Sequence, residues 1–270
     1  LGRVPDDPEA ISVAPVEVIR FEVAAGADPR DRLDAPGDLM VSDHHLALSY
    51  ARSRPDLQTV PLPWRHVYAA VSPPRGHLAA SSVTDDMRAR LATDAVRGDA
   101  RGASTPYWST TPGCPSAAGT PVRGSEIAIG TRPRVLFRET DSVAGDLAAR
   151  LVALGGFGSG DGLLAALLPT GSGRLSSLAL GHQAFDDALT EGREALYLVR
   201  LDRDTLDPCQ PWRGLEARAP WLRAPGVSAS AAVVPLVETR AHAILRRGVG
   251  RLSLDGDGGL VLAAAREARR

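Results

Sequence analysis

The residues best suited to hold a small ligand lie at two places in the first quarter of the chain. Ser42, Asp43 and His44 form a polar turn between an apolar segment and a segment with a helical pattern. Trp64 and Arg65 stand together further along. An indole can stack on a planar group, and a guanidinium binds a carboxylate through two parallel hydrogen bonds. These residue types predict binding chemistry rather than a catalytic signature.

Each of these residues also has an ordinary structural explanation. Asp43 is a natural N-cap for a helix expected over His44 to Arg54. Trp64 lies in an apolar segment and could pack in the core or at a hinge. Tyr107 and Trp108 lie in a long segment rich in Pro, Gly, Ser and Thr. There they either contact a ligand or anchor the segment to the body of the protein.

Metal and hydrolase chemistry have weaker support. His44 and His45 are adjacent, and neighbouring side chains at a helix start point in different directions, so they rarely bind one ion. The sequence has no G-x-S-x-G pattern. Cys114 stands in a Pro-Gly-Cys-Pro setting, which offers no helix N-terminus to activate a thiolate. We therefore expect no metal site, no cofactor and no catalytic residue.

The two cysteines, Cys114 and Cys209, both lie in proline-rich segments. An even pair suits a disulfide in an oxidising compartment, and two reduced thiols fit equally well. Two cysteines alone do not make a zinc site.

Composition indicates a globular chain and excludes some partners. The 270 residues are 44% hydrophobic and 23% charged, which is ordinary for a folded protein. A net charge of -1 and the absence of a basic stripe argue against nucleic acid as a partner. No segment approaches the roughly 18 to 20 continuous apolar residues of a membrane helix. The chain starts without Met or an apolar signal core, so we expect a missing leader or upstream segment.

Hydrophobic periodicity predicts strands and helices that alternate along the chain. The expected strands cover residues 16–23, 38–42, 59–64, 67–73, 134–139 and 194–202. A further strand is expected to begin at residue 233. The expected helices cover a short stretch within 25–38, then 44–54, 84–101, 141–156, 182–192 and 210–222. Asp141 is the expected N-cap of the fourth of these helices. After the strand that starts at residue 233, we expect an irregular stretch and a closing hairpin turned by Asp-Gly-Asp-Gly-Gly.

The order of these segments resembles the solute-binding proteins of peptide- and nickel-type ABC transporters. The similar stretches are VEVIRFEV with DLMVS, PLPWRHVYAAVSP, DDMRARLATDAVRGDAR, RVLFRETDSVAGDLAARLVALG and FDDALTEGREALYLVRLDRDTLDP. Members of this family are usually much longer, so the resemblance implies that most of the N-terminal part of the first lobe is missing from this chain. The Asp-Arg that usually ends the helix pattern reads here as Asp99-Ala100-Arg101.

The resemblance implies an α/β fold with mixed sheets, the two-lobed periplasmic-binding-protein-like fold of type II. The first lobe would hold residues 1–83 and 224–270, and the second lobe residues 84–223. The crossings between the lobes would lie near Ser81 to Thr84 and near Pro220 to Pro225.

The resemblance also implies a function without catalysis. A peptide or similar small solute would bind in a cleft between the lobes, and an ABC transporter permease would be the protein partner. The protein would be an extracytoplasmic or periplasmic monomer, with any membrane association through a missing leader. A noncatalytic interaction module that reuses the fold, or a hydrolase, is the alternative. The implied ligand-binding residues are Ser42, Asp43, His44, Trp64, Arg65, Tyr68, Tyr107 and Trp108.

Overall fold

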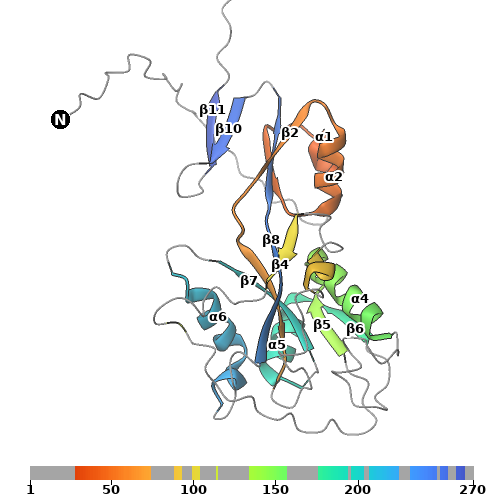
Figure 1. Cartoon of the computed structure of the whole chain (residues 1–270), viewed down its shortest axis with the longest axis vertical. Helices are drawn as coiled ribbons and strands as arrows, with labels where there is room; N and C mark the ends of the chain where they lie inside the picture. The colour runs from red at the N-terminus through yellow and green to blue at the C-terminus, as the bar shows by residue number, and fades with distance from the viewer. Residues whose placement is uncertain are drawn as a thin grey trace, which may run out of the picture. The chain divides into compact units, whose positions relative to one another are not determined.

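The chain divides into two compact units, each with its own apolar core (Figure 1). The computed structural model describes residues 28–73, 88–92, 99–103, 114, 134–156, 176–193, 196–203, 207–224, 232–247, 250–254 and 260–264. Unit 1 contains Leu1–Pro63 and Ala241–Arg270, and unit 2 contains Trp64–Arg240. No described helix has both the length and the apolar character needed to span a membrane.

Unit 1 contains an antiparallel sheet whose central strand comes from the far end of the chain. Its strands are β1 (Leu39–Ser42), β9 (His242–Arg246) and β2 (Leu57–Pro61), in that order. The helices are α1 (Pro29–Asp34) and α2 (His45–Ser53). Their buried residues pack with Ile244 of β9. A hairpin of β10 (Gly250–Leu254) and β11 (Leu260–Ala264) follows, as predicted.

The prediction of an irregular stretch after residue 239 is wrong, because β9 forms there. Its residues pair with β1 on one side and β2 on the other. Ile244 packs in one core cluster, and Ala243 and Leu245 pack in another. A strand buried on both faces is apolar at successive positions, so it lacks the alternating pattern by which strands are found.

Unit 2 is built on a six-stranded mixed sheet in the order β4-β8-β3-β7-β5-β6. β3 runs antiparallel to β7 and β8, and β5 runs parallel to β6 and β7. The strands are β3 (His66–Val71), β4 (Ala100–Gly102), β5 (Arg134–Arg138), β6 (Ser176–Leu180), β7 (Leu196–Asp202) and β8 (Val233–Thr239).

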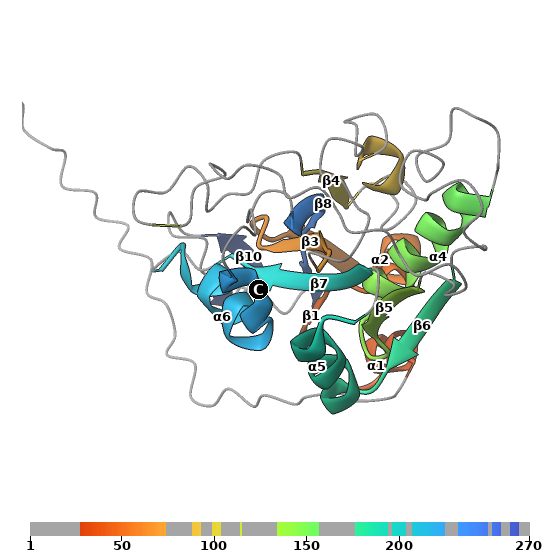
Figure 2. The same ribbon diagram turned by 90° about the horizontal axis from the view of Figure 1, so that it is seen from below.

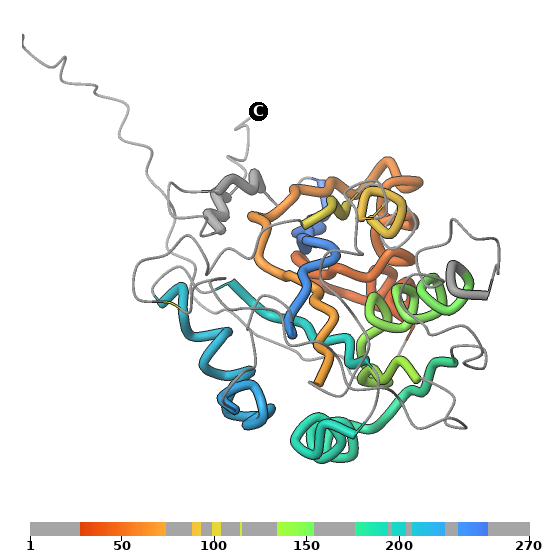
Figure 3. The backbone as a smooth tube through the Cα atoms, turned by 60° about the horizontal axis from the view of Figure 1, so that its bottom comes forward, coloured from red at the N-terminus to blue at the C-terminus, as the bar shows by residue number. Residues whose placement is uncertain are grey.

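Helices cover both faces of this sheet (Figure 2). One face packs against α4 (Ser142–Gly156), and the other packs against α5 (His182–Glu191), α6 (Gln210–Arg218) and the short 3-10 helix η3 (Pro220–Arg223). In Figure 3, β5, α4, β6 and α5 are seen by their colours, from yellow-green to teal. The predicted α/β class with mixed sheets is therefore confirmed.

Helix α4 agrees with its sequence prediction. Asp141 Oδ1 accepts a hydrogen bond from Ala144 N at 3.0 Å, as an N-cap does. Val143, Leu147 and Leu151 are buried against the sheet. Of the predicted helix 84–101, residues 88–92 are helical, but the prediction is wrong at its end, where residues 100–102 form β4. The predicted strand at 16–23 lies outside the described residues.

The predicted lobes place β3 and β8 in the first lobe, whereas both strands pair within the sheet of unit 2. The predicted crossing near residues 81–84 lies outside the described residues. The helix η3, at the other predicted crossing, packs in the core of unit 2 through Leu222. The lobe boundaries stay a prediction, because compact packing does not by itself locate a hinge.

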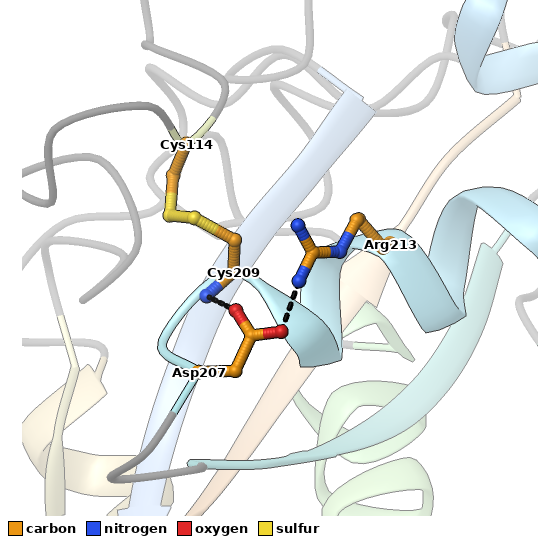
Figure 4. Close-up of a disulfide and its surroundings, with 4 residues drawn as sticks. All are labelled: Cys114, Asp207, Cys209 and Arg213. Carbon is orange, nitrogen blue, oxygen red and sulfur yellow. Dashed lines mark hydrogen bonds and ion pairs between the residues drawn. A yellow bond between two sulfur atoms is a disulfide. The ribbon is translucent and has the colours of Figure 1, made fainter.

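A disulfide joins Cys114 to Cys209, and so resolves the alternative that the sequence left open (Figure 4). The two Cα atoms lie 5.3 Å apart, and 95 positions separate the residues in the chain. Cys209 is the N-cap residue of α6. Its backbone N–H donates to Asp207 Oδ1 at 3.2 Å, and Asp207 also pairs with Arg213 of α6. The disulfide therefore fixes Cys114 to the start of a helix that packs on the sheet.

Replacing Gly192 by alanine should lower the free energy of unfolding by about 2 kcal/mol. Gly192 ends α5 with φ of 61°, in the left-handed region. An added Cβ would also lie 2.7 Å from Nε1 of Trp221, which donates to the Leu189 carbonyl at 2.8 Å. Urea unfolding measures the change.

Gly214→Ala is the matched control for that measurement. Gly214 lies inside α6, and a Cβ there would have nothing within 4 Å. This change should be neutral or stabilising by about 0.5–1 kcal/mol, because alanine favours a helix more than glycine does. Equal effects of the two substitutions would contradict the importance of the left-handed turn.

Candidate functional site

The predicted polar turn in unit 1 mainly organises the start of α2. Ser42 ends β1, and its Oγ accepts a hydrogen bond from His44 N at 3.1 Å. His44 Nδ1 accepts from Leu46 N at 3.2 Å. The helix therefore begins at His45 with His44 as its N-cap, and the prediction that Asp43 caps it is wrong. The imidazole Nδ1 can reach the second helical N–H, as a capping oxygen would.

The neighbouring imidazoles of His44 and His45 stack, with ring centroids 5.0 Å apart. Among the described residues, no three His, Cys, Asp or Glu side chains gather as a metal site would require. His44 thus caps α2, and the two imidazole rings stack on each other.

In unit 2, Trp64 belongs to a connected group of charged side chains at one end of the six-stranded sheet. The Trp64 ring lies under two guanidinium groups, with Cζ of Arg101 4.5 Å and Cζ of Arg240 4.6 Å from its centroid. Arg240 also approaches the buried Asp99 at 3.9 Å. We call Trp64, Asp99, Arg101, Arg203, Glu238 and Arg240 the arginine cluster.

Glu238 is the buried anion of the arginine cluster. Only 7% of its side chain is exposed, and the five residues of β8 that precede it are all apolar. Arg101 Nε donates to its Oε2 at 2.8 Å, and Arg203 pairs with its Oε1 at 3.2 Å. A carboxylate this deeply buried requires such partners. Glu238 therefore holds two arginines in place beside Trp64.

Arg65 follows Trp64 in the chain and differs from the arginines of the cluster. Its side chain is exposed, and its backbone carbonyl accepts a hydrogen bond from Arg203 N. With Arg101, Arg203 and Arg240 set against Asp99 and Glu238, the cluster carries more positive than negative charge. Such an arrangement suits a ligand with a carboxylate or another planar anion.

Tyr68 connects the sheet to α4. Its side chain is fully buried, and its hydroxyl donates to Asp141 Oδ1 at 2.9 Å. The same carboxylate caps α4. Tyr107 and Trp108 lie outside the described residues. Trp64 thus lies in the arginine cluster with its neighbour Arg65 exposed, whereas the Tyr68 side chain reaches a helix N-terminus.

The sequence prediction missed Asp99, Arg101, Arg203, Glu238 and Arg240. One signal was available, because Glu238 directly follows the apolar run of β8 and must find a cationic partner once buried. Asp99 and Arg101 were assigned to the end of a helix, but residues 100–102 form β4. That strand pairs Arg101 directly with Glu238.

A second charged group lies where β3 begins and β7 ends. His66 Nδ1 and Asp202 Oδ1 are 2.8 Å apart, and Arg200 Nε lies 2.9 Å from the same oxygen. Burial acts to raise the pKa of Asp202, but the hydrogen bond with His66 and the charge of Arg200 outweigh it. The pKa of Asp202 therefore lies below its ordinary value.

This lowered pKa predicts a pH-dependent contribution to stability. A carboxyl group with a folded-state pKa below its unfolded value stabilises the protein above the unfolded pKa, near about 4. The contribution is lost as the pH falls through the folded-state pKa. Asp202→Asn should therefore be less stable than the wild type by under about 1 kcal/mol at pH 7, because 57% of the Asp202 side chain is exposed and solvent screens its charge. Urea unfolding between pH 2 and 7 should show the gap closing in acid, and a constant gap would contradict the assignment.

Solved structures share this fold, although no family model and no curated protein matches the chain. NikA from Brucella suis in complex with Fe(III)-EDTA matches 87% of this chain and 60% of its own, with a TM-score of 0.56 and 13% identity. AppA from Clostridium difficile, a candidate peptide binding protein, matches 83% and 56%, with a TM-score of 0.50 and 12% identity. The ABC transporter substrate binding protein CtaP from Listeria monocytogenes matches 78% and 51%, with a TM-score of 0.49 and 11% identity.

The chain spans a little over half the length of these solved proteins. The matches cover most of this chain, and the mixed sheets agree with the expected architecture. The predicted periplasmic-binding-protein-like fold is confirmed. The chain therefore has the fold of the solute-binding proteins of peptide- and nickel-type ABC transporters.

Proposed function

We propose that this chain is the solute-binding component of an ABC transporter and binds a peptide or similar small solute without chemical change. The observation that carries the proposal is a fold of this type in which an exposed arginine, Arg65, directly follows Trp64 of the arginine cluster in the chain. The permease of the transporter is the proposed protein partner, and the proposed receptor acts as a monomer.

Arg65 is the proposed anchor for a carboxylate of the solute. Among the described residues, no carboxylate forms an ion pair with its guanidinium. Arg101, Arg203 and Arg240, by contrast, each pair with Glu238 or Asp99. Bidentate pairing with a carboxylate would satisfy this group. The two guanidiniums over Trp64 leave its ring less available for stacking on a solute. We therefore assign Arg65 the larger share of solute recognition.

The other residues of the predicted site stay part of the proposal. Ser42 and His44 use one side-chain acceptor each within the turn before α2. The side chains of Ser42, Asp43 and His44 are the proposed polar contacts with the solute. Tyr107 and Trp108 are proposed aromatic contacts. Tyr68 is proposed to act through Asp141, which its hydroxyl contacts.

We propose an extracytoplasmic location, which the disulfide supports. Disulfides persist in oxidising compartments and are rare where thiols are kept reduced. Cys114 and Cys209 form such a bond and account for both cysteines of the chain. A receptor that supplies a transporter from outside the cytoplasm would meet those conditions.

A binding screen with purified protein tests the proposal. Di- to pentapeptides, amino acids, opines and nickel chelates are added in turn, and the unfolding temperature is recorded. A solute that binds only the folded protein stabilises it by about 2.7 kcal/mol at one hundred times its Kd. We expect a shift for one of these classes, and isothermal titration then gives the Kd.

Matched arginine variants decide whether Arg65 is the anchor. Arg65→Ala should weaken binding by about tenfold to one hundredfold, the range for a lost charge-assisted hydrogen bond. Arg193→Ala is the control, because Arg193 is an exposed arginine of the same unit that pairs with Glu191. A flat screen on folded protein would contradict the receptor function for these solutes and favour an interaction module. Equal binding by both variants would contradict only the role of Arg65.

A further inference from the structure

A third charged group of unit 2 lies between β5, α5 and α6, on the face of the sheet that both helices cover (Figure 2). Arg138, the last residue of β5, donates from Nη2 to both oxygens of Asp186 of α5, at 2.7 and 3.0 Å. Arg218, the last residue of α6, brings Nη1 to 3.6 Å from Asp186 Oδ1. His182 of α5 brings Nε2 to 3.5 Å from Asp186 Oδ2. Two arginines and a histidine thus share one carboxylate.

This carboxylate does not neutralise both guanidinium groups. Among the described residues, no other carboxylate forms an ion pair with Arg138 or Arg218. The two arginine side chains are only 28% and 30% exposed, so solvent screens their charges incompletely. Burial lowers the pKa of Arg218, and the charge of Arg138 lowers it further. The charges of Asp186 and Asp202 offset this shift only in part. The group therefore keeps an excess of positive charge.

Both guanidinium groups also have donors without a suitable acceptor. Nε of Arg138 is buried, and no atom in the described part of the chain accepts a hydrogen bond from it. The Arg218 guanidinium meets the Gly214 carbonyl at 3.4 Å and Asp186 at 3.6 Å. Both distances exceed the roughly 2.7–2.9 Å of a charge-assisted hydrogen bond. Arg218 therefore has both the charge and the donors to bind an anion at short range.

Neighbouring residues hold the two arginines in position. The guanidinium carbon of Arg138 lies 5.5 Å from the ring centroid of the buried Phe185. Thr190 Oγ1 donates to the Arg218 carbonyl at 2.8 Å, which joins the end of α6 to α5. Groups that are already ordered lose less entropy when they bind. The N-cap of α5, Gly181, has no capping side chain, so the positive end of the helix dipole also favours an anion here.

We propose that Arg138 and Arg218 form a binding site for a phosphate group, and that Asp186 positions the two guanidiniums. Guanidinium forks match the oxygens of a phosphate, which has enough acceptors to pair with both groups at once. The negative charge of the phosphate balances the excess positive charge that Asp186 leaves. The site lies in unit 2 alone, and it does not depend on the proposed solute or on Arg65.

Isothermal titration of the full chain with inorganic phosphate tests the site. The ionic strength is kept constant with sodium chloride, because salt alone screens the repulsion between the arginines. We expect saturable binding of inorganic phosphate or of methyl phosphate, and the tighter of the two shows whether the free ion or an ester is preferred. Acetate should bind about tenfold more weakly, since it has fewer acceptor oxygens. Equal binding of acetate, or no saturable binding of either phosphate, would overturn the proposal.

Variants of α6 locate the binding. Arg218→Gln should weaken phosphate binding by about tenfold to one hundredfold, the range for a lost charge-assisted hydrogen bond. Arg218→Lys should bind with an intermediate affinity, because it keeps the charge but loses the planar fork. Arg213→Gln is the matched control and should bind as the wild type does, because Arg213 lies in the same helix and pairs with Asp207.

The affinity of the folded variants separates a binding role from a structural one. If Arg218 only attached α6 to α5, its replacement would lower the stability but leave phosphate affinity unchanged, and this result would overturn the proposal. Circular dichroism identifies the variants that fold. If Arg218→Gln does not fold, Arg218→Lys carries the comparison with Arg213→Gln.

Discussion

Replacing Cys114 and Cys209 together by serine should lower the free energy of unfolding by about 4 kcal/mol. The disulfide closes a loop across 95 positions, and a cross-link of this span restricts the unfolded chain by roughly 3–5 kcal/mol. The change is large against a typical total stability of about 5–15 kcal/mol. Urea unfolding of the oxidised wild type and the double variant measures it.

A reductant gives the internal control for this prediction. It should destabilise the wild type toward the value of the double variant, and it should leave the double variant unchanged, because that protein has no cysteine left. A double variant within about 1 kcal/mol of the oxidised wild type would contradict the prediction, since the loop-closure effect expected for this span is several times larger.

Glu238→Gln should destabilise the protein by about 2–4 kcal/mol. The substitution keeps the shape of the side chain but removes the negative charge that two guanidiniums contact, from Arg101 and from Arg203. Removing one partner of a buried ion pair costs about 3–5 kcal/mol. The partial exposure of both arginines reduces that figure here. Urea unfolding at pH 7 gives the difference.

Glu191→Gln is the matched control for Glu238→Gln. Glu191 pairs with Arg193 at 3.4 Å, and both side chains are mostly exposed. Exposed pairs contribute about 0–1 kcal/mol, so this change should be small. If the two Glu→Gln variants lost equal stability, burial of the Glu238 carboxylate would not be the source of its effect.

Helices and strands could be predicted where their own residues include a capping side chain or apolar residues at regular spacing. Helix α4 could be predicted because Asp141 caps it and Val143, Leu147 and Leu151 repeat at helical spacing. The apolar run of β7 likewise predicts a strand. Strand β6 was missed because it is short and begins with two serines, so its pairing with β5 decides its structure.

The candidate site could be predicted only in part, because its contacts join distant parts of the chain. Trp64 and Arg65 were identified by their residue types. The guanidiniums over Trp64 come from Arg101 and Arg240, which strand pairing brings to it. The cap at His44 was missed for a local reason, since an Asp in the preceding position is the more common capping residue.

The order of β1, β9 and β2 has a consequence for how the protein forms during synthesis. β9 lies between β1 and β2, but it leaves the ribosome only after the whole of unit 2. β1 and β2 have no direct partner in each other, so the sheet of unit 1 cannot close until β9 is available. Unit 2 is continuous in sequence and can fold first, because domains generally fold as units in the order of their synthesis. Before β9 is synthesised, β1 and β2 have unpaired backbone edges. Unpaired strand edges promote aggregation, so we expect the nascent chain to be most prone to aggregation at this stage.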